Sequence, residues 1–372
     1  PLFPIEERKV PASNIPGEET WPTQPYPIKP LPYARQFLSE EDLSHYSQTS
    51  YDSLLKKFKS LRYEGMFTPP DTRGALMFPG SRGGSSWGGG AFDPSTGIIY
   101  VKSNDSPEIS LLKKVEPQDS KVDQSLYTQG KALYTNYCMS CHGSDRNGQE
   151  PDYPSLAGLD LRMSKPDILN KIKRGGGKMP AFASILTGKE DAIIAYLFQQ
   201  ENVKQSIEKS FLKEIQNNES ANTMIKSDTL ARYLNVKAYG YFRDSEDRPG
   251  IKPPWGTLSA INLNTGDYVW KIPAGNIPDL QEEKSQLTGT EGSVGPIVTS
   301  GGLVFLGGTE DKKMRAFDKE TGKLLWETTL PTIGTSSPCT YMSDGKQYVA
   351  ISVAGNKKEP GGYIVAYSLQ DQ

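Results

Sequence analysis

Short runs of hydrophobic residues, each bounded by glycine-containing turns, recur along much of the chain. Residues 98–104, 303–306, 347–352 and 363–368 are rich in valine, isoleucine, leucine and tyrosine. Runs this short, enriched in β-branched and aromatic residues, are typical of strands rather than helices. The pattern therefore predicts a body built from β-hairpins.

Three of the predicted hairpins share one turn, in which an Asp or Asn stands four residues before a glycine. These glycines are Gly97, Gly266 and Gly322, and Trp270 and Trp326 follow the last two turns. The last two glycines are 56 residues apart (322 − 266), and the first two are 169 apart (266 − 97). A strand-rich repeat of this length with a tryptophan after each turn predicts propeller blades, about four in this chain.

The wide first spacing indicates that a separate unit interrupts the propeller. It exceeds one repeat by 113 residues (169 − 56). Whole domains are tolerated in exposed loops whose ends lie close together. We therefore expect an insertion in a propeller loop, flanked by charged linkers at 111–121 and 204–218.

Helical periodicity is concentrated in and around this interruption. Apolar residues recur at helical spacing in 188–201, and the segments 125–136 and 205–216 also predict helices. A further short amphipathic helix is predicted at 52–61. Residues 1–35, by contrast, hold nine prolines. Such a segment cannot form a sheet interior and predicts an extended strap across a larger body.

The predicted insertion contains the sequence Cys138-Met-Ser-Cys141-His142. C-x-x-C-H is the signature of covalent c-type haem attachment. Two thiols at this spacing can add to the two vinyl groups of one porphyrin, and the adjacent imidazole can serve as the proximal iron ligand. We therefore expect haem c at Cys138, Cys141 and His142.

A c-type haem also requires a sixth ligand, and Met179 is the leading candidate. It follows Gly175-Gly176-Gly177-Lys178 and precedes Pro180. Glycines let a loop approach a flat ring closely, and Met with His raises the reduction potential. The alternative methionine, Met163, lacks such a loop and is expected to pack in a core.

A zinc knuckle or a redox dithiol is the alternative to haem at these cysteines. Structural zinc requires four nitrogen or sulfur ligands. The remaining candidates in the sequence are Cys339, expected to be a small buried residue, and His45, expected at the surface. Their positions far along the chain favour haem.

Composition narrows the function classes. The chain has 372 residues with 42 basic and 44 acidic side chains, a formal net charge of −2. This near-neutral balance argues against nucleic acid as a partner.

No apolar run is long enough to cross a membrane. The chain starts with Pro rather than Met, so we expect a processed chain or a piece of a longer one. Haem attachment of this type implies an extracytoplasmic, periplasmic location.

The stretch around the C-x-x-C-H motif resembles a class I cytochrome c, over roughly residues 120–203. The Met179-Pro180 dipeptide and the sequence Tyr153-Pro-Ser-Leu-Ala-Gly158 carry that resemblance along with the motif. The resemblance implies that the Pro154 carbonyl holds the His142 ring.

The rest of the chain resembles the pyrroloquinoline quinone (PQQ) dehydrogenases, in particular the membrane-type glucose dehydrogenase branch. The hairpins of pattern A-x-[DN]-x-x-T-G-x-x-x-W are similar to the tryptophan-docking motif of that family. Further similar segments are Phe3–Arg8, Pro22–Pro25, Pro253–Leu258, Gly301–Thr309 and Gly345–Val349. The resemblance implies part of an eight-bladed propeller that carries PQQ and calcium on its axis, with this chain as the C-terminal half.

Residue roles in the quinone site follow from the resemblance alone. The family's catalytic aspartate, its quinone-contacting lysine and most calcium ligands would lie upstream, so the catalytic residues here are unknown. Trp87 and Asn104 resemble positions near the quinone, although related sequences often carry Asn where this chain has Lys102. For Trp87 an inter-blade packing role is the alternative. Trp270 and Trp326 are expected to stack on neighbouring blades.

We therefore expect a multidomain protein with propeller blades and an inserted all-α cytochrome c domain. The expected domains are a strap and first blade segment at 1–118, the cytochrome at 119–204 and further blades at 205–372. The expected function is part of a periplasmic quinohaemoprotein dehydrogenase, inactive as this piece alone. It would oxidise a sugar or alcohol at PQQ and pass electrons through its haem to a respiratory or cytochrome acceptor. The alternatives are a cytochrome electron carrier on a propeller scaffold, or a propeller interaction module with haem as a sensor.

Overall fold

The structure of the protein is a computed structural model. It describes residues 3–81, 83–115, 125–148, 153–199, 232–236, 240–280, 287–354 and 362–369. The helix predicted at 205–216 and the linker predicted at 204–218 lie outside the described residues, as does most of the linker at 111–121.

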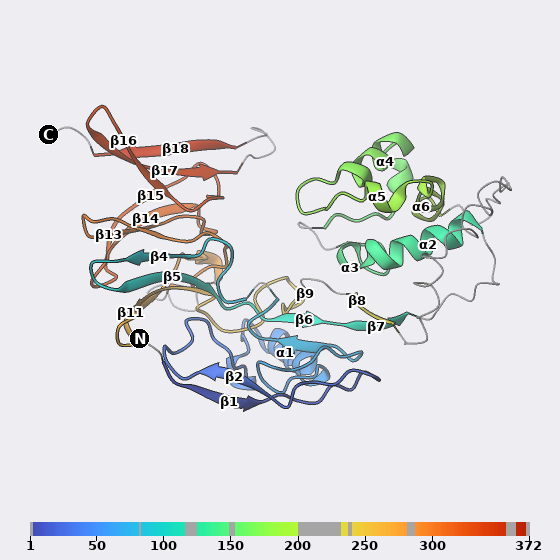
Figure 1. Cartoon of the computed structure of the whole chain (residues 1–372), viewed down its shortest axis with the longest axis horizontal. Coiled ribbons are helices and arrows are strands. Elements are labelled where there is room, and N and C mark those ends of the chain that lie inside the picture. Colours follow the sequence, from blue (N-terminus) through green and yellow to red (C-terminus); the bar gives the residue numbers. More distant parts are fainter. Residues whose placement is uncertain are drawn as a thin grey trace, which may run out of the picture.

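Three antiparallel sheets form the main body, as the propeller pattern predicted. They lie one above another in Figure 1, with the C-terminal sheet furthest from the N-terminal segment. The first sheet has the order β4-β5-β10-β11, the second β12-β13-β14-β15 and the third β16-β17-β18. Their strands are β4 (Gly90–Asp93), β5 (Ile98–Asn104), β10 (Gly256–Asn262), β11 (Asp267–Pro273), β12 (Ile297–Val298), β13 (Leu303–Leu306), β14 (Lys313–Asp318), β15 (Leu324–Thr329), β16 (Cys339–Ser343), β17 (Lys346–Val353) and β18 (Tyr363–Ser368).

The structure corrects the expectation that the three similar hairpins belong to three successive blades. The β4–β5 hairpin, which turns at Gly97, and the β10–β11 hairpin, which turns at Gly266, share one sheet because β5 pairs with β10. The long spacing is therefore an excursion between two neighbouring strands of one sheet. The described residues form two four-stranded sheets, two three-stranded sheets and two two-stranded sheets. The second three-stranded sheet has the order β3-β6-β9, with strands β3 (Ala75–Met77), β6 (Glu108–Ser110) and β9 (Gly240–Tyr241). The figure of about four blades stays a prediction.

The N-terminal segment lies along the first sheet as a strap, as its prolines predicted. Lys29 Nζ is 2.7 Å from an oxygen of Asp267 on β11. Further along, the Arg35 guanidinium donates to the buried carboxylate of Asp105 at 2.8 Å. Within the strap, β1 (Ile5–Lys9) and β2 (Thr23–Pro27) pair with each other. Smaller elements beside the strap are η1 (Glu40–Asp42), α1 (Gln48–Ser60), η3 (Pro278–Leu280) and the strands β3, β6 and β9.

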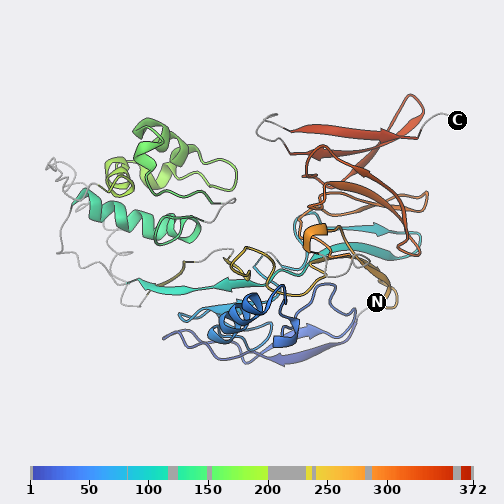
Figure 2. The same ribbon diagram turned by 180° about the vertical axis from the view of Figure 1, so that it is seen from behind.

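A helical unit occupies the excursion between β5 and β10. Strand β7 (Leu112–Val115) leads toward the helical unit, and β8 (Arg232–Asn235) leads back from it. The two strands pair antiparallel, so the outgoing and the returning chain lie side by side. Figure 2, seen from behind, shows the helices at the far end of this ribbon from the sheets. The helices are α2 (Leu126–Tyr137), α3 (Met139–His142), η2 (Leu159–Leu161), α4 (Lys165–Arg174), α5 (Ala183–Leu186) and α6 (Glu190–Leu197).

A close contact between α2 and α6 sets the core of the helical unit. Gly130 lies so near the Ala192 carbonyl that a Cβ there would be 1.8 Å from its oxygen. The buried side chains of this core are Tyr134, Met139, Leu159, Ile168, Ile172, Leu186, Ile193, Ile194, Tyr196 and Leu197. No helix within the described ranges is long and apolar enough to span a bilayer.

A tryptophan joins the first sheet to the second. The Trp270 ring lies over the turn of the next sheet, where a Cβ on Gly322 would be 2.8 Å from its ring carbon. Its Nε1 donates to the Lys319 carbonyl at 3.0 Å, and the Tyr100 hydroxyl donates to the same oxygen at 3.1 Å. Trp326 faces Tyr367 of the third sheet with ring centres 5.5 Å apart, but 38% of it stays exposed.

We predict that replacing Gly322 by Ala destabilises the protein through this contact. The φ of Gly322 is +71°, and the added Cβ would meet the Trp270 ring. Gly345→Ala is a matched control because its φ is +75° and its Cβ would have nothing within 4 Å. The control should lose about 1 kcal/mol from backbone strain alone. Gly322→Ala should lose about 2 kcal/mol more in urea unfolding, through overpacking. Equal losses would show that the contact contributes nothing.

Candidate functional site

The C-x-x-C-H segment forms one turn of helix directly after α2. Cys138 ends α2, and its carbonyl accepts hydrogen bonds from the amides of Cys141 at 3.2 Å and His142 at 2.9 Å. Gly143, with φ +78°, ends the turn. Residues three apart in a helix lie on the same side, so both thiols can face one flat group.

The His142 ring is buried and oriented by its neighbour. Its Nδ1 lies 3.0 Å from the Pro154 carbonyl oxygen, the contact expected at this position. Because a carbonyl only accepts, the proton must be on Nδ1, and Nε2 keeps a free lone pair for a metal. Gly148 permits this approach, since a Cβ there would lie 2.3 Å from the Tyr153 carbonyl oxygen.

Met179 is held in a tight turn that requires glycine. The amide of Gly176 donates to the Met179 carbonyl at 2.9 Å, and the Met179 amide donates back at 3.2 Å. Gly175 has φ +70°, and a Cβ on it would be 2.5 Å from the Met179 carbonyl oxygen. The Met179 side chain packs against the same core as Cys138.

The C-x-x-C-H segment and the methionine turn share a core and are also joined by an aromatic contact. The rings of Tyr137, beside Cys138, and Phe182, beside the methionine turn, have centres 6.5 Å apart.

Met163 was expected to pack in a core, but it is 39% exposed because it stands in an open turn after η2. The structure thus brings Cys138 and Met179 to one core and leaves Met163 outside it.

The described residues around the cysteines do not supply the four nitrogen or sulfur ligands of a structural zinc site. Within the described part of the chain, no group of three or more His, Cys, Asp and Glu could hold a metal ion. His45 packs against Tyr51 with the rings tilted by 47°, and Cys339, predicted to be buried, is exposed on β16.

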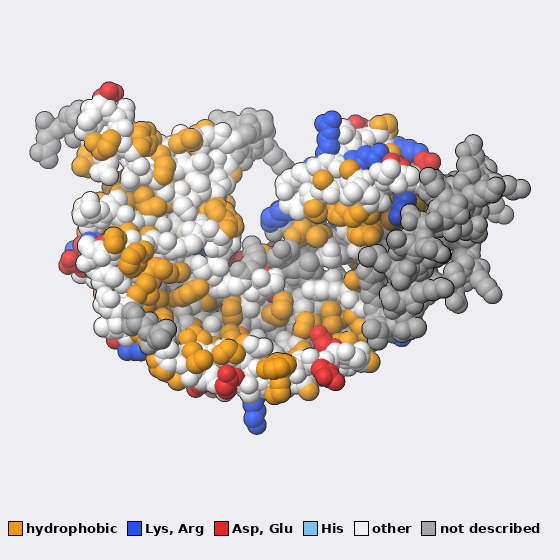
Figure 3. Space-filling view, viewed as in Figure 1, with side chains coloured by type: hydrophobic (Ala, Val, Ile, Leu, Met, Phe, Trp, Pro, Cys, Tyr) orange, Lys and Arg blue, Asp and Glu red, His pale blue; other side chains and the backbone are white. Residues whose placement is uncertain are grey.

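Basic side chains surround the methionine turn. Lys171, Lys173 and Arg174 form the last turn of α4, and Lys178 lies in the turn itself. Lys173 is paired with Glu190 at 2.8 Å, whereas Lys171 and Arg174 are exposed. Figure 3 shows Lys and Arg side chains projecting from the helical unit.

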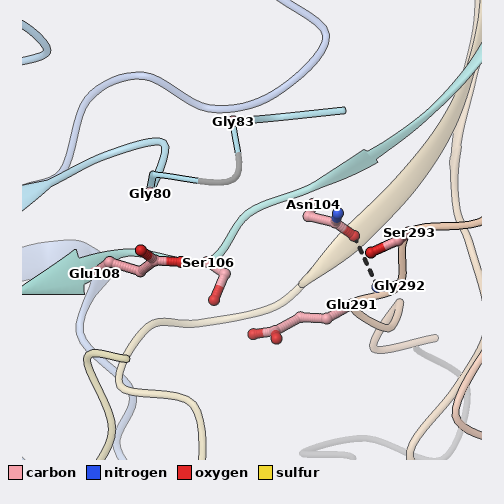
Figure 4. A pocket seen from close by; sticks show the side chains of 8 residues that line it. All are labelled: Gly80, Gly83, Asn104, Ser106, Glu108, Glu291, Gly292 and Ser293. Atoms are coloured by element: carbon pink, nitrogen blue, oxygen red, sulfur yellow. Dashed lines mark hydrogen bonds between the residues drawn. The ribbon is translucent and has the colours of Figure 1, made fainter. Parts of the chain in front are cut away.

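Asn104, predicted to lie near the quinone, is at the end of β5 in the first sheet. It faces the loop that precedes the second sheet. Asn104 lines a small pocket there with Gly80, Gly83, Ser106, Glu108, Glu291, Gly292 and Ser293 (Figure 4). The pocket volume is about 20 Å³, room for roughly one water molecule. Trp87 does not line this pocket and is 70% exposed. The loop that carries Trp87 nevertheless contacts the pocket, because the Asn104 amide donates to the Gly84 carbonyl at 2.7 Å and the Gly88 amide donates to the Ser293 carbonyl at 3.0 Å.

Lys102 is the residue at this site whose importance the sequence did not reveal. Only 3% of it is exposed, and its Nζ donates to Asn104 Oδ1 at 2.5 Å and to the carbonyls of Thr290 and Gly292 at 3.0 Å each. The Gly292 amide donates to the same Asn104 oxygen at 2.9 Å. Because Lys102 Nζ and the Gly292 amide are both donors, the side-chain amide of Asn104 must turn its oxygen toward them. In the sequence, a lysine within an otherwise apolar strand was the signal that could have indicated this buried contact.

The two cofactors implied by the sequence fit these sites differently. A haem fits the helical unit, because the thiols share one helix side and His142 keeps Nε2 free. A quinone of several fused rings does not fit a pocket of about 20 Å³, so this pocket does not enclose PQQ by itself.

Comparisons with known proteins agree with the sheet architecture. The family described as PQQ, glucose/ethanol/alcohol dehydrogenase, beta-propeller domain, matches residues 1–168 and 174–349. The chain is similar to a quinate/shikimate dehydrogenase (quinone) of Acinetobacter baylyi, at 28% identity over all of this chain and 36% of that protein. It is 30% identical to a probable quinate dehydrogenase (quinone) of Xanthomonas campestris pv. juglandis, over the same shares.

A third relative matches a shorter stretch. A 1-butanol dehydrogenase (cytochrome c) of Thauera butanivorans is 37% identical over 106 residues, which is 28% of this chain and 13% of that protein. The chain spans little more than a third of the length of the quinate dehydrogenases it matches end to end. With its stacked antiparallel sheets and a family match over most of its length, the chain belongs to the PQQ-dependent glucose/ethanol/alcohol dehydrogenase β-propeller family.

Proposed function

We propose that the helical unit, residues 119–204, is a cytochrome c domain that carries one covalent haem. Cys138 and Cys141 would bind the porphyrin, and His142 and Met179 would be the axial ligands. The observation that carries the proposal is the His142 ring, whose Nδ1–H is held by Pro154 so that Nε2 is available. The packing of Cys138 and Met179 on one core supports it. The short match to a dehydrogenase named for cytochrome c is consistent with it.

Each residue of this site has a definable role. The haem supplies a centre that takes up and releases one electron at a time. Pro154 fixes the protonated nitrogen of His142, and such outer contacts raise the basicity of a metal ligand. The glycines before Met179 allow its backbone to turn back on itself, and the Tyr137–Phe182 contact holds that turn near the cysteines.

We further propose that the two sheet segments, 1–118 and 205–372, are part of a longer PQQ-dependent dehydrogenase. Its substrate would be a hydroxyl compound such as a sugar, an alcohol or a quinate-like acid, as the names of the relatives suggest. PQQ, calcium and the catalytic residues would be held largely by chain that this sequence does not contain. The haem unit would be the tethered electron acceptor, present at high effective concentration. The compartment would be extracytoplasmic, as haem attachment requires.

A non-enzymatic electron carrier on a propeller scaffold is the second candidate. The small volume of the Asn104 pocket favours it for this chain in isolation. The exposed surface of the third sheet favours the longer PQQ-dependent dehydrogenase. On this sheet Met342 is 63% exposed and Ile364 is 72% exposed. Figure 3 shows apolar side chains on this part of the surface. Exposed apolar sheet surface of this kind calls for a partner such as further blades.

We predict that Met179→Ala lowers the reduction potential of the haem-loaded chain and lets cyanide bind rapidly to the ferric iron. Loss of the thioether removes the ligand that raises the potential and opens the sixth position. Met163→Ala is the matched control and should change neither property. Redox titration and cyanide-binding kinetics measure both, and an unchanged spectrum in Met179→Ala would contradict the assignment.

We predict that an anionic acceptor reacts at the basic surface beside Met179. The oxidation rate of the reduced haem by ferricyanide should fall steeply as ionic strength rises, because exposed charges steer encounter. Lys171→Gln with Arg174→Gln should lower the rate at low salt several-fold. Lys312→Gln with Lys323→Gln is the control, because these exposed lysines directly precede β14 and β15, away from the helical unit. Stopped-flow rates that are independent of salt would mean that this surface is only solvated.

We predict that residues 1–372 alone show no PQQ-dependent oxidation of glucose, glycerol or quinate in a dye-linked assay with added PQQ and calcium. A propeller axis site is built from all its blades, and this chain has part of the ring. A longer protein that contains this chain should oxidise one of these substrates and show reduced haem after its addition. Turnover by the 372-residue chain would place the whole site within it.

A further inference from the structure

Tyr134 forms hydrogen bonds at both ends of the C-x-x-C-H segment. Its backbone carbonyl accepts from the Cys138 amide at 2.8 Å, at the start of the segment. Its hydroxyl donates to the carbonyl of Gly143, the residue after His142, at 2.6 Å. Only 1% of Tyr134 is exposed, so neither bond competes with solvent. Tyr134 thus contacts both ends of the segment, with its backbone carbonyl at the start and its hydroxyl at the end.

The direction of the hydroxyl bond is fixed by its chemistry. The Gly143 carbonyl can only accept, so the tyrosine must donate. Burial, with a smaller contribution from Cys138, raises the pKa of the Tyr134 hydroxyl, which therefore stays protonated throughout the ordinary pH range. The bond is a permanent structural contact and not a pH-dependent one.

The tyrosine is in turn anchored to the opposite side of the helical unit. Its ring packs on Tyr196 of α6 with centres 5.1 Å apart. Arg146, in the loop after the motif, lies over the same Tyr196 ring at 5.4 Å and donates to the Tyr196 carbonyl at 3.3 Å. The Arg146 carbonyl accepts from the Leu156 amide at 2.8 Å, close to Pro154. The backbone on both sides of His142 is therefore tied to α2 and α6.

We propose that Tyr134 is a positioning residue for the axial histidine, an inference that rests on the proposed haem function. With the Gly143 carbonyl fixed, the backbone at His142 cannot rotate away from Pro154. The 3.0 Å contact of Nδ1 is preserved, and Nε2 keeps one direction toward the iron. Outer contacts of this kind set both the orientation and the basicity of a histidine ligand.

Tyr134→Phe tests the proposal, because it removes the hydroxyl and keeps the ring in the core. Tyr127→Phe is the matched control. Tyr127 lies on the same helix with its ring 5.3 Å from Tyr196, and no hydrogen bond of its hydroxyl is seen within the described ranges. Urea unfolding with the haem attached confirms that both variants are folded.

Three readouts separate a positioning role from a purely structural one. In Tyr134→Phe the ferric low-spin EPR signal should broaden, because the ring plane of His142 is no longer fixed. The midpoint potential should rise, because a weaker contact with Pro154 makes the imidazole a poorer donor to ferric iron. Hydrogen exchange of the Gly148 amide, which donates to the His142 carbonyl at 2.9 Å, should accelerate about fivefold, the effect of losing one hydrogen bond. Tyr127→Phe should leave all three unchanged.

The failures of the two proposals are distinguishable. Haem-loaded Tyr134→Phe with the EPR signal, potential and Gly148 exchange of the Tyr127→Phe control would overturn the role of Tyr134 alone. A wild-type chain that takes up no covalent haem in a host with attachment machinery would overturn the proposed function and this inference with it.

Discussion

The pairing of β5 with β10 is the constraint on which the rest of the structure depends. Gly256 lies opposite Asn104 and Asn262 opposite Ile98, although the intervening chain has 151 residues between 104 and 256. These two strands are the centre of the first sheet. Because they are antiparallel neighbours, the chain leaves the end of β5 and returns to the start of β10 at the same end of the sheet. The β7–β8 ribbon satisfies this requirement, because it brings the outgoing and returning chain together. The Trp270 contact with the Gly322 turn then joins this sheet to the next.

The helical unit has its own core but is attached to the ribbon that carries it. Leu234 and Val236, at β8, pack against the core that also contacts Cys138 and Met179. The first sheet has a separate core around Tyr100, Leu258 and Trp270. Two cores linked by a paired ribbon suit a tethered electron acceptor, because the tether limits the distance that the acceptor can reach. The two proposed cofactors would then share one chain without sharing a core.

The sequence predicted a local contact better than the connectivity. The resemblance of the C-x-x-C-H stretch to a class I cytochrome c implied the contact between His142 and Pro154, which the structure contains. The turn pattern at Gly97 and Gly266 could not reveal that both hairpins share a sheet, because both hairpins of one blade can carry the same turn. The roles of Lys102 and Tyr134 depend on contacts between residues that no local pattern reports. Trp87, inferred from resemblance alone, does not line the pocket that contains Asn104.

The central claim is that this chain of the PQQ propeller family carries its own covalent haem. Intact mass of the 372-residue chain, produced in a host with haem-attachment machinery and recorded beside a Cys138→Ala/Cys141→Ala variant, tests it most directly. We expect a mass increase of one haem in the wild type, a c-type visible spectrum, and neither in the double variant. A wild-type mass equal to the polypeptide alone would contradict it.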